Sequence, residues 1–267
     1  MLAESSNSIK KKFDKAPDDY VTGLFDYYAR AGYTDHMLQS LRYRGHELVC
    51  DMLYQNLIEA GDVIDTFGYR NLKHSRALAA DIGCGSGLVG KALRQRGWRG
   101  TIIGNDLSST MIKLASESTY ESISYIDSTQ VTSNTEVLPV YDSLHMSNCI
   151  SFLTGWYEDT TRESMDVVLA GDVICYMGSL EELFRAVYAV LSRNGLFVFS
   201  TEALNMSNTT VRADYVLQNT ARYAHNLTYV SNTACQIGFT VLRSESVVLR
   251  TNGDADVDGN VFLLVKY

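Results

Sequence analysis

A glycine-rich segment and two acidic residues form the part of this chain best suited to chemistry. Asp81-Ile-Gly-Cys-Gly-Ser-Gly87 follows an apolar run and places glycine at alternate positions. Alternate glycines allow a tight turn and let a ligand lie against bare peptide groups. A second acidic residue, Asp106, ends the next apolar run, 21 positions after Gly85. Rossmann-like folds use a carboxylate at that place to hold a ribose diol. Together, these features predict a site for an adenosine-containing cofactor.

Two cofactor classes fit this turn, because Gly85-Ser-Gly-Leu-Val-Gly90 also satisfies the dinucleotide pattern G-x-G-x-x-G. Asp81 distinguishes the two classes. A helix N-terminus already favours anions, so a pyrophosphate bound there is not helped by a neighbouring carboxylate. A cofactor that carries a sulfonium and an ammonium group is attracted by one. The residues therefore favour a sulfonium nucleoside over NAD, whereas glycines that merely turn the chain would explain neither carboxylate.

The elements that must position these residues alternate between strands and helices, which is typical of an α/β fold. A strand is predicted to end at Ile82 and to be followed by a helix over 88–95. Further strands are predicted at 101–105, 143–146, 165–170 and 196–200, with helices from Ser108, over 179–191 with a capping box Ser179 to Glu182, and over 227–236. With the two C-terminal strands described below, the pattern predicts a mostly parallel, seven-stranded sheet with helices on both faces.

The remaining segments predict how one domain, 18–267, is organised. Residues 1–17 are polar and are predicted to be disordered, and the tyrosine-rich region 18–60 is predicted to form a helical cap over the open edge of the sheet. Region 116–138 reads as an insertion, either mobile or forming a flap beside the site. Region 201–226 is too long for an idle connector and is predicted to be a substrate loop.

Two long C-terminal strands, over 239–249 and 261–267, are expected to form an antiparallel hairpin. Dinucleotide dehydrogenases seldom end in this way. The sequence also shows no second domain that could hold the substrate of a hydride transfer. Both points argue against an NAD-binding oxidoreductase.

Composition limits the partners that can be expected. The formal net charge of −8 argues against nucleic acid, and no apolar stretch has the length of a membrane span. The five cysteines lack C-x-x-C spacing, which favours reduced thiols over a disulfide set or a metal site. The polar N-terminus lacks the apolar region of a signal peptide. We therefore expect a cytoplasmic protein, with an organelle left open, that is a monomer or homodimer and acts on a small molecule.

The pattern D-x-G-x-G-x-G followed by an acidic strand end resembles motif I of class I methyltransferases. Similarity over about 20–115 and 138–267 points further, to a group of methyltransferases associated with TPR repeats or related to one linked to the Williams–Beuren region, although no TPR period is present here. This resemblance rests on four further segments, Asn105-Asp-Leu-Ser108, Gly171-Asp-Val-Ile-Cys-Tyr176, Leu196-Phe-Val-Phe-Ser-Thr-Glu202 and Arg222-Tyr-Ala-His225. It implies S-adenosyl-L-methionine as cofactor.

The resemblance also implies how this cofactor would be held. Asp81 and the peptide groups of Gly83, Cys84, Gly85 and Gly87 should face its methionyl end, and Asp106 should hold the ribose. Around the adenine and the amino-acid group, the expected contacts are Leu107 and Met111 (the latter equally readable as a helix-core residue), Asn148 in place of an acidic residue, the amide of Cys149, the carbonyl of Gly171 for the ammonium group, and Arg44 for the carboxylate.

The residues that follow the fourth and fifth strands are candidates for contact with the methyl acceptor, because open α/β sheets bind ligands at that edge. The catalytic candidates are His225, Asp172 and Tyr176, and the substrate-binding candidates are Arg222, Tyr223, Glu202 and Tyr28. His225 is the best candidate for a base, although a structural, hydrogen-bonded histidine is the more common case. Arg222 is expected to clamp a carboxylate, unless it forms an ion pair with Asp214 or Glu202.

Two kinds of acceptor follow from these residues. If Arg222 binds an acid and no base is needed, a sulfur acceptor fits, such as the 4-methylthio-2-hydroxybutyrate of dimethylsulfoniopropionate synthesis. If His225 acts as a base, an oxygen or nitrogen acceptor fits better. A protein substrate and a non-catalytic cofactor-binding module remain as alternatives.

Overall fold

The structure is a computed structural model that describes residues 14–59, 77–125, 133–204, 213–253 and 255–267. Its main sheet follows the order β10-β11-β7-β6-β1-β2-β5, and the short strands β8 and β9 extend it beside β7. The seven strands of the main path are β1 (Leu78–Ile82), β2 (Thr101–Asp106), β5 (Ser143–Met146), β6 (Met165–Ala170), β7 (Leu191–Ala203), β10 (Phe239–Asn252) and β11 (Ala255–Lys266).

The predicted fold class is confirmed. β1 pairs in parallel with both β2 and β6, and β7 pairs in parallel with β6. The C-terminal hairpin is antiparallel, because β11 runs antiparallel to β7 and to β10. The centre of the sheet is dry, since every residue of β1 is buried. A fully buried parallel strand explains why the sequence here is a continuous apolar run rather than an alternating one.

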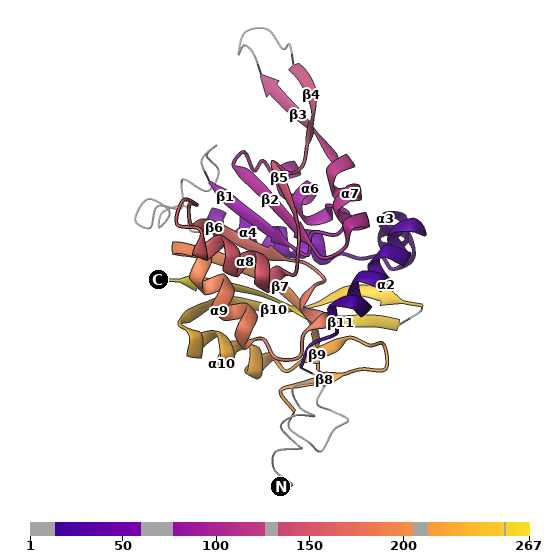
Figure 1. The fold of residues 1–267 in the computed structure, drawn as a ribbon, viewed down its shortest axis with the longest axis vertical. Coiled ribbons are helices and arrows are strands. Elements are labelled where there is room, and N and C mark those ends of the chain that lie inside the picture. The colour runs from indigo at the N-terminus through magenta and orange to yellow at the C-terminus, as the bar shows by residue number, and fades with distance from the viewer. Residues whose placement is uncertain (1–13, 60–76, 126–132, 205–212, 254) are drawn as a thin grey trace.

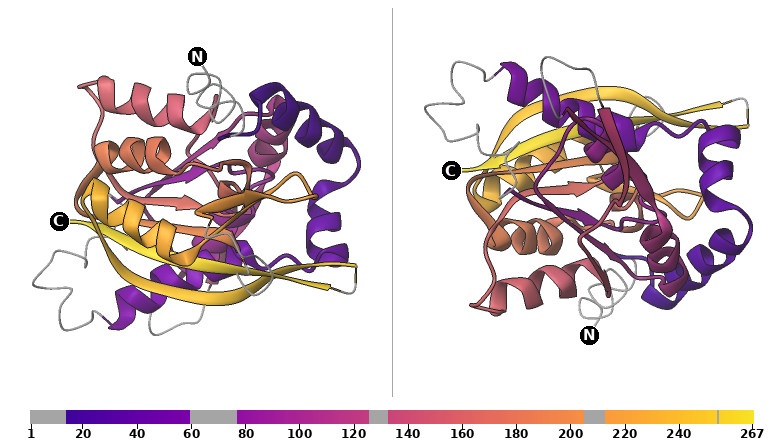
Figure 2. Two further views of the ribbon diagram at one scale, coloured as in Figure 1. Left: turned by 90° about the horizontal axis from the view of Figure 1, so that it is seen from below. Right: turned by 90° about the horizontal axis from the view of Figure 1, so that it is seen from above.

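Helices cover both faces of the sheet (Figures 1 and 2). Side chains of α4 (Gly45–Glu59) and α6 (Leu88–Gln95) share one apolar core with alternate residues of β1, β6, β7 and β11. The other residues of these strands face a second core under α8 (Cys149–Glu158), α9 (Glu181–Val190) and α10 (Leu227–Ile237). The period-2 alternation of a strand therefore divides the core into two layers. No helix in the described part of the chain is long and apolar enough to cross a membrane.

Local signals fix the starts and ends of several helices. Ser108 precedes α7 (Ser109–Glu117) and its hydroxyl accepts from the amide of Met111, as expected of an N-cap. Gly238 ends α10 in the left-handed conformation. The predicted capping box of α9 was wrong, since Leu180 occupies its N-cap and no side chain caps the helix.

The expected helical cap divides into two parts. α2 (Asp18–Arg30), α3 (Tyr33–Asp35) and the short π-helix η1 (His36–Ser40) lie near the open edge of the sheet, where α2 packs on α7 (Figure 1). α4 instead packs flat on the sheet, because its buried residues Val49 and Leu53 join the first core. Residues 60–76 lie outside the described part of the chain.

Two expectations about irregular segments need correction. The segment predicted to be disordered, 1–17, was too long. Lys15 forms a β-bridge with Met177, and the amide of Ala16 donates to the carbonyl of Tyr176 at 2.9 Å. Residues 1–13 lie outside the described part. The insertion contains an antiparallel hairpin, β3 (Thr119–Tyr125) with β4 (Ser133–Pro139), which projects from the domain (Figure 1). Its described residues line no part of the pocket considered below, so it is not a flap beside that pocket.

The expected substrate loop is partly regular. β7 continues to Ala203, and β8 (Tyr215–Leu217) pairs with β9 (Tyr223–His225), which lies parallel to the end of β7. The segment 205–212 lies outside the described residues. The pairing brings residues of the loop back to the edge of the sheet at which β6 and β7 end.

Candidate active site

A pocket of about 880 Å³, including solvent at its mouth, lies at the C-terminal ends of β1, β2, β5 and β6. Its floor comes from the loops that follow these strands, and its roof from residues 15–25, Tyr33 and Tyr43. The site thus occupies the edge of the sheet that the sequence indicated.

The glycine-rich turn forms one wall of the pocket. Gly83 has a φ of +64°, and a Cβ there would lie 2.1 Å from a methyl group of Val173. Gly85 also has a positive φ, but a Cβ there would lie 3.7 Å from the ring of Tyr33, an ordinary van der Waals contact. At Gly83, only glycine combines this backbone with so close an approach. Gly83, Cys84 and Gly85, which were predicted to contact the cofactor, all line the pocket.

Asp106 ties the turn to the next strand. Its two carboxylate oxygens accept from the amides of Gly85 and Ser108, both at 2.9 Å. Burial raises the pKa of Asp106, although these amide bonds oppose the rise. Asp106 lines the pocket, as does Leu107. Since each carboxylate oxygen can accept a second bond, the group can hold the turn and a ligand hydroxyl together.

Asp81 and Gly87 were expected to face the cofactor, and the structure contradicts this. Asp81 lies beneath the turn, where its carboxylate accepts from the Tyr141 hydroxyl at 2.6 Å, and it does not line the pocket. Burial raises its pKa to about 7. Gly87 is the N-cap of α6 and would meet Ser118 and Tyr141 if it carried a Cβ. Neither residue lines this pocket, and both support the turn from its other side.

At the far end of the pocket, the predicted pair Asn148 and Cys149 forms part of the lining. The amide oxygen of Asn148 accepts from the amide of Ile150 at 3.0 Å, and its nitrogen donates to Asp18 at 3.1 Å. Asp18 also lines the pocket and was not predicted. Met111 is fully buried and does not line the pocket, so it is a residue of the helix core.

Gly171 lines the pocket beside the glycine-rich turn, and its carbonyl accepts a hydrogen bond from the Ser200 hydroxyl. Arg44 was expected to bind a carboxylate here, and this was wrong. Its side chain is exposed, approaches Glu47 at 4.0 Å and does not line the pocket. Its backbone amide donates a hydrogen bond to the carbonyl of Leu249 in β10.

An aromatic cluster surrounds the other end of the pocket. The ring of Phe25 meets those of Tyr176 and Tyr33 edge-on, with centroids 5.5 and 6.0 Å apart, and all three line the pocket with Tyr43. The Tyr176 hydroxyl is buried and has no hydrogen-bond partner among the described residues. Burial raises its pKa well above the usual range, so it stays protonated. Tyr28 was predicted as a contact but does not line the pocket.

Behind this cluster, two arginines and two carboxylates form a buried ion cluster: Asp172, Glu202, Arg222 and Arg250. Arg222 donates to Asp172 at 2.6 Å and approaches Glu202 at 3.4 Å, and Arg250 donates to Asp172 at 3.1 Å and also to Glu202. Gln218 satisfies the other oxygen of Glu202 at 2.7 Å. The guanidinium group of Arg222 lies over the ring of Tyr176, 5.3 Å from its centroid. Of the four charged residues, only Asp172 lines the pocket.

This pairing changes the role expected of Arg222. A guanidinium group that already bonds two carboxylates is not free to clamp an acidic substrate. The alternative prediction, an ion pair, is therefore the correct one: Arg222 pairs with Glu202 as expected, and its second partner is Asp172 rather than Asp214. Burial opposes the ionisation of Asp172, but the two guanidinium groups outweigh it and hold its pKa below the usual range. Arg250 was missed, because a single arginine within a long strand gives no signal of burial.

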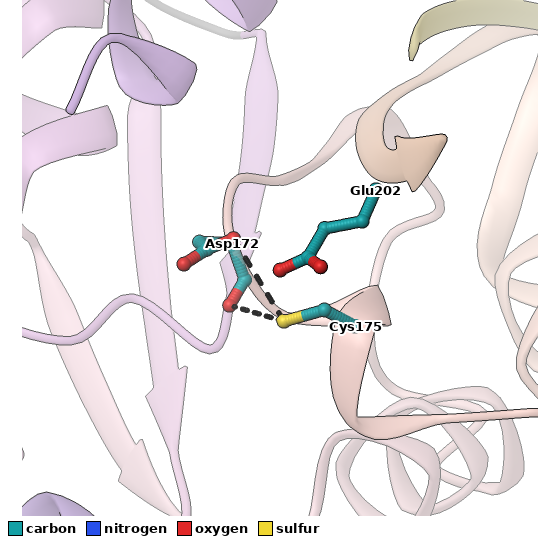
Figure 3. Close-up of side chains that lie close together, drawn as sticks. All are labelled: Asp172, Cys175 and Glu202. Carbon is teal, nitrogen blue, oxygen red and sulfur yellow. Dashed lines mark hydrogen bonds between the residues drawn. The ribbon is translucent and has the colours of Figure 1, made fainter. Parts of the chain in front are cut away.

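Asp172, Cys175 and Glu202 converge from the loop after β6, from η3 (Ile174–Tyr176) and from the end of β7 (Figure 3). One ligand atom of each lies within 4.8 Å of the others, close enough to share a metal ion. The two guanidinium groups already balance the two carboxylates, and burial raises the pKa of the Cys175 thiol well above its usual range. A protonated thiol and paired carboxylates are poor metal ligands. The arrangement fits an ion cluster rather than a metal centre.

His225 was expected to act as a base and lies in the wrong place for it. Its side chain is fully buried, its Nε2 donates to the carbonyl of Gly178 at 3.1 Å, and its ring stacks on Tyr229. Burial lowers its pKa to about 4. Neither His225 nor Tyr223, which packs against Gly178, lines the pocket. Both are structural residues of the β8–β9 extension.

Comparison with known proteins matches residues 80–199 to a family model described as a methyltransferase domain. Among solved structures, the chain is similar to magnesium protoporphyrin IX methyltransferase from Synechocystis with bound SAM, at 15% identity and a TM-score of 0.57, with 94% of this chain and 98% of that one covered. It is also similar to 1,6-didemethyltoxoflavin-N1-methyltransferase from Burkholderia thailandensis, at 12% identity and a TM-score of 0.57, covering 94% and 90%. The search of curated proteins gave no match.

Proposed function

Because the chain is a class I S-adenosylmethionine-dependent methyltransferase, we propose that it methylates a small molecule at an atom that needs no protein base. A thioether sulfur is the acceptor that fits best. The observation that carries this proposal is the roofed aromatic end of the pocket, beside the ionised carboxylate of Asp172 and away from His225.

The residues of the pocket fit the cofactor. The glycine-rich turn leaves bare peptide groups at Gly83 and Gly85, Asp106 retains lone pairs for a ribose diol, and Asn148 and Cys149 lie at the far end. Gly171 can offer its carbonyl a second bond, from an ammonium group. When bound, S-adenosylmethionine supplies an electrophilic methyl group. The remaining work of the protein is to hold the acceptor in line and to exclude water.

The absence of histidine from the described lining separates the acceptor classes. An alcohol or a protonated amine must lose a proton, whereas a thioether sulfur does not. Asp172 is a weak base, because two guanidinium groups hold its pKa low, and the tyrosines of the lining keep their protons. A thioether becomes a sulfonium cation on methylation. The aromatic rings that line this end of the pocket favour a cation beside them.

Tyr176 adds a means of orienting the acceptor. Its hydroxyl is a donor without a partner in the described part of the protein, and its ring is held between Phe25 and the guanidinium group of Arg222. A buried donor of this kind costs free energy until a ligand satisfies it. We therefore expect the acceptor to carry an oxygen close to its nucleophilic sulfur. Since Arg222 is already paired, recognition of a substrate carboxylate does not rest on it.

The test is a matched set of acceptors incubated with S-adenosylmethionine, with formation of S-adenosylhomocysteine as the readout. The set contains 4-methylthio-2-hydroxybutyrate, its neutral amide, and hydroxyl and amino analogues without sulfur. We expect both thioethers to react and the sulfur-free analogues to remain unchanged, with no histidine-like limb in the pH profile of single-turnover transfer. Transfer only to the hydroxyl or amino analogues, with a limb near pH 6–7, would refute the proposal.

A further inference from the structure

The residues just before α2 form part of the pocket roof and are fixed to the loop after β6. The carbonyl of Asp14 accepts from the amide of Gly178 at 2.8 Å, and Lys15 forms a β-bridge with Met177. Both bonds attach this part of the roof directly after η3, the element that carries Tyr176. The backbone of Lys15 is therefore held beside the end of the pocket that we assign to the methyl acceptor.

Lys15 carries the only positive charge among the described residues that line the pocket. Its side chain is 37% exposed, so its ammonium group lies where the pocket opens to solvent. The ammonium nitrogen is 2.7 Å from a carboxylate oxygen of Asp18. An ammonium group has three donors, and this ion pair leaves two of them for a ligand.

The other cations considered for an acidic ligand do not reach the pocket. Arg222 and Arg250 are bound to two buried carboxylates, and neither lines the pocket. Arg44 faces solvent outside it. A lysine also suits the border with solvent, because its flexible stem lets a point charge follow a ligand.

We propose that Lys15 binds a carboxylate of the methyl acceptor, so that the substrate is a thioether with an acid at its other end. The inference rests on the proposed function and narrows it from small thioethers to anionic ones. It puts the sulfur among the aromatic rings and the acid at the border with solvent. A carboxylate bound there keeps part of its hydration, which avoids most of the cost of burying an ion.

The same contacts also fit a second role, in which Lys15 only supports the cofactor half of the pocket. Asp18 accepts from the side-chain nitrogen of Asn148 at 3.1 Å, so its ion pair with Lys15 steadies that end too. The two roles predict different effects. A residue that binds the acceptor acts on the KM of an acidic acceptor alone, whereas one that supports Asp18 acts on cofactor affinity, whatever the acceptor.

The test measures methyl transfer to 4-methylthio-2-hydroxybutyrate and to its neutral amide. In Lys15→Met, which keeps the apolar stem, the KM for the acid should rise about three- to tenfold, the worth of a partly exposed bond to a charged group. The kcat and the KM for the amide should stay the same. Lys15→Arg should retain most of the affinity for the acid. The control Lys113→Met, at an exposed lysine of α7 outside the pocket, should change nothing.

Calorimetry with S-adenosylhomocysteine separates the two roles. Its affinity should be the same in Lys15→Met as in the unaltered protein, and a loss as large as the rise in KM would place Lys15 in the cofactor half and overturn the inference. Equal changes of KM for the acid and the amide, or no change for either, would overturn it as well. If the unaltered protein methylated neither thioether, the proposed function itself would fall, and this inference with it.

Discussion

The two halves of the active site are built in different ways. The cofactor half, after β1, β2 and β5, uses backbone amides, bare glycines and one carboxylate that two amides hold. The half proposed for the acceptor, after β6 and β7, uses four charged side chains, of which Asp172 and Arg250 lie 78 positions apart in sequence. A site made of backbone is encoded locally, whereas one made of ion pairs depends on the whole sheet being assembled.

The largest effect should come from removing a cation from the acceptor half. Arg250→Met leaves Asp172 and Glu202 with one guanidinium group between them in a buried place, which should lower the free energy of unfolding by about 3–5 kcal/mol. Urea unfolding at pH 7 measures this. The exposed pair of Arg185 with Glu181 provides the control, and Arg185→Met should cost less than about 1 kcal/mol. Equal losses in the two variants would show that the cluster is not a buried ion network.

A change in the cofactor half should be nearly as large and have a steric cause. Gly83→Ala places a Cβ against Val173 at a positive φ, which should cost about 2–5 kcal/mol of stability and abolish binding of S-adenosylhomocysteine. Gly97 is the control, because it also has a positive φ, of +93°, and no atom lies within 4 Å of an added Cβ. Gly97→Ala should cost only the backbone strain, about 1–2 kcal/mol. The comparison fails if Gly97→Ala is the more damaging of the two.

The two halves should also respond oppositely to pH. Burial raises the pKa of Asp81 to about 7. The protonated carboxyl therefore stabilises the folded protein fully below pH 3.8, the pKa in the unfolded chain, and this stabilisation is lost as the pH rises to 7. The free energy of unfolding should fall over that window by up to about 1.4 kcal/mol per pH unit, and Asp81→Asn should flatten the slope. Asp256→Asn, at an exposed position, should leave it unchanged. The pKa of Asp172 is lowered instead, so its contribution is lost only as the pH falls in acid.

The smallest effect on stability is expected for Tyr176, which lies between the two halves and should affect the rate of transfer instead. Tyr176→Phe removes a hydroxyl that has no described partner in the free protein, so the unfolding free energy should hardly change. Transfer to an oxygen-bearing thioether should fall about tenfold, the worth of one hydrogen bond to the acceptor. Tyr27→Phe, on the exposed face of α2, should alter neither quantity. A full rate with Tyr176→Phe would remove this residue from the site.

The sequence predicted the cofactor half more completely than the acceptor half, for the same physical reason. Gly83, Asp106 and Asn148 follow strands whose apolar runs are visible, so their place at the sheet edge could be deduced. The sequence could not show that Asp81 lies beneath the turn. The direction of its side chain depends on a hydrogen bond from Tyr141, which lies 60 positions further along the chain. His225 and Arg222 were misjudged because β8 and β9, each only three residues long, give no period.

Arg250 lies on β10, which follows Asp172, Glu202 and Arg222 in the sequence, and this position affects the order in which the ion cluster can form during synthesis. A ribosome makes Asp172, Glu202 and Arg222 first, and until β10 joins β11 the two acids share a single cation. Since an unbalanced charge in a dry interior is costly, the nascent chain gains little by closing this region early. The pairing of β10 with β11 should therefore complete this ion cluster, and a polypeptide cut short before Arg250 should be more sensitive to proteases than the whole chain.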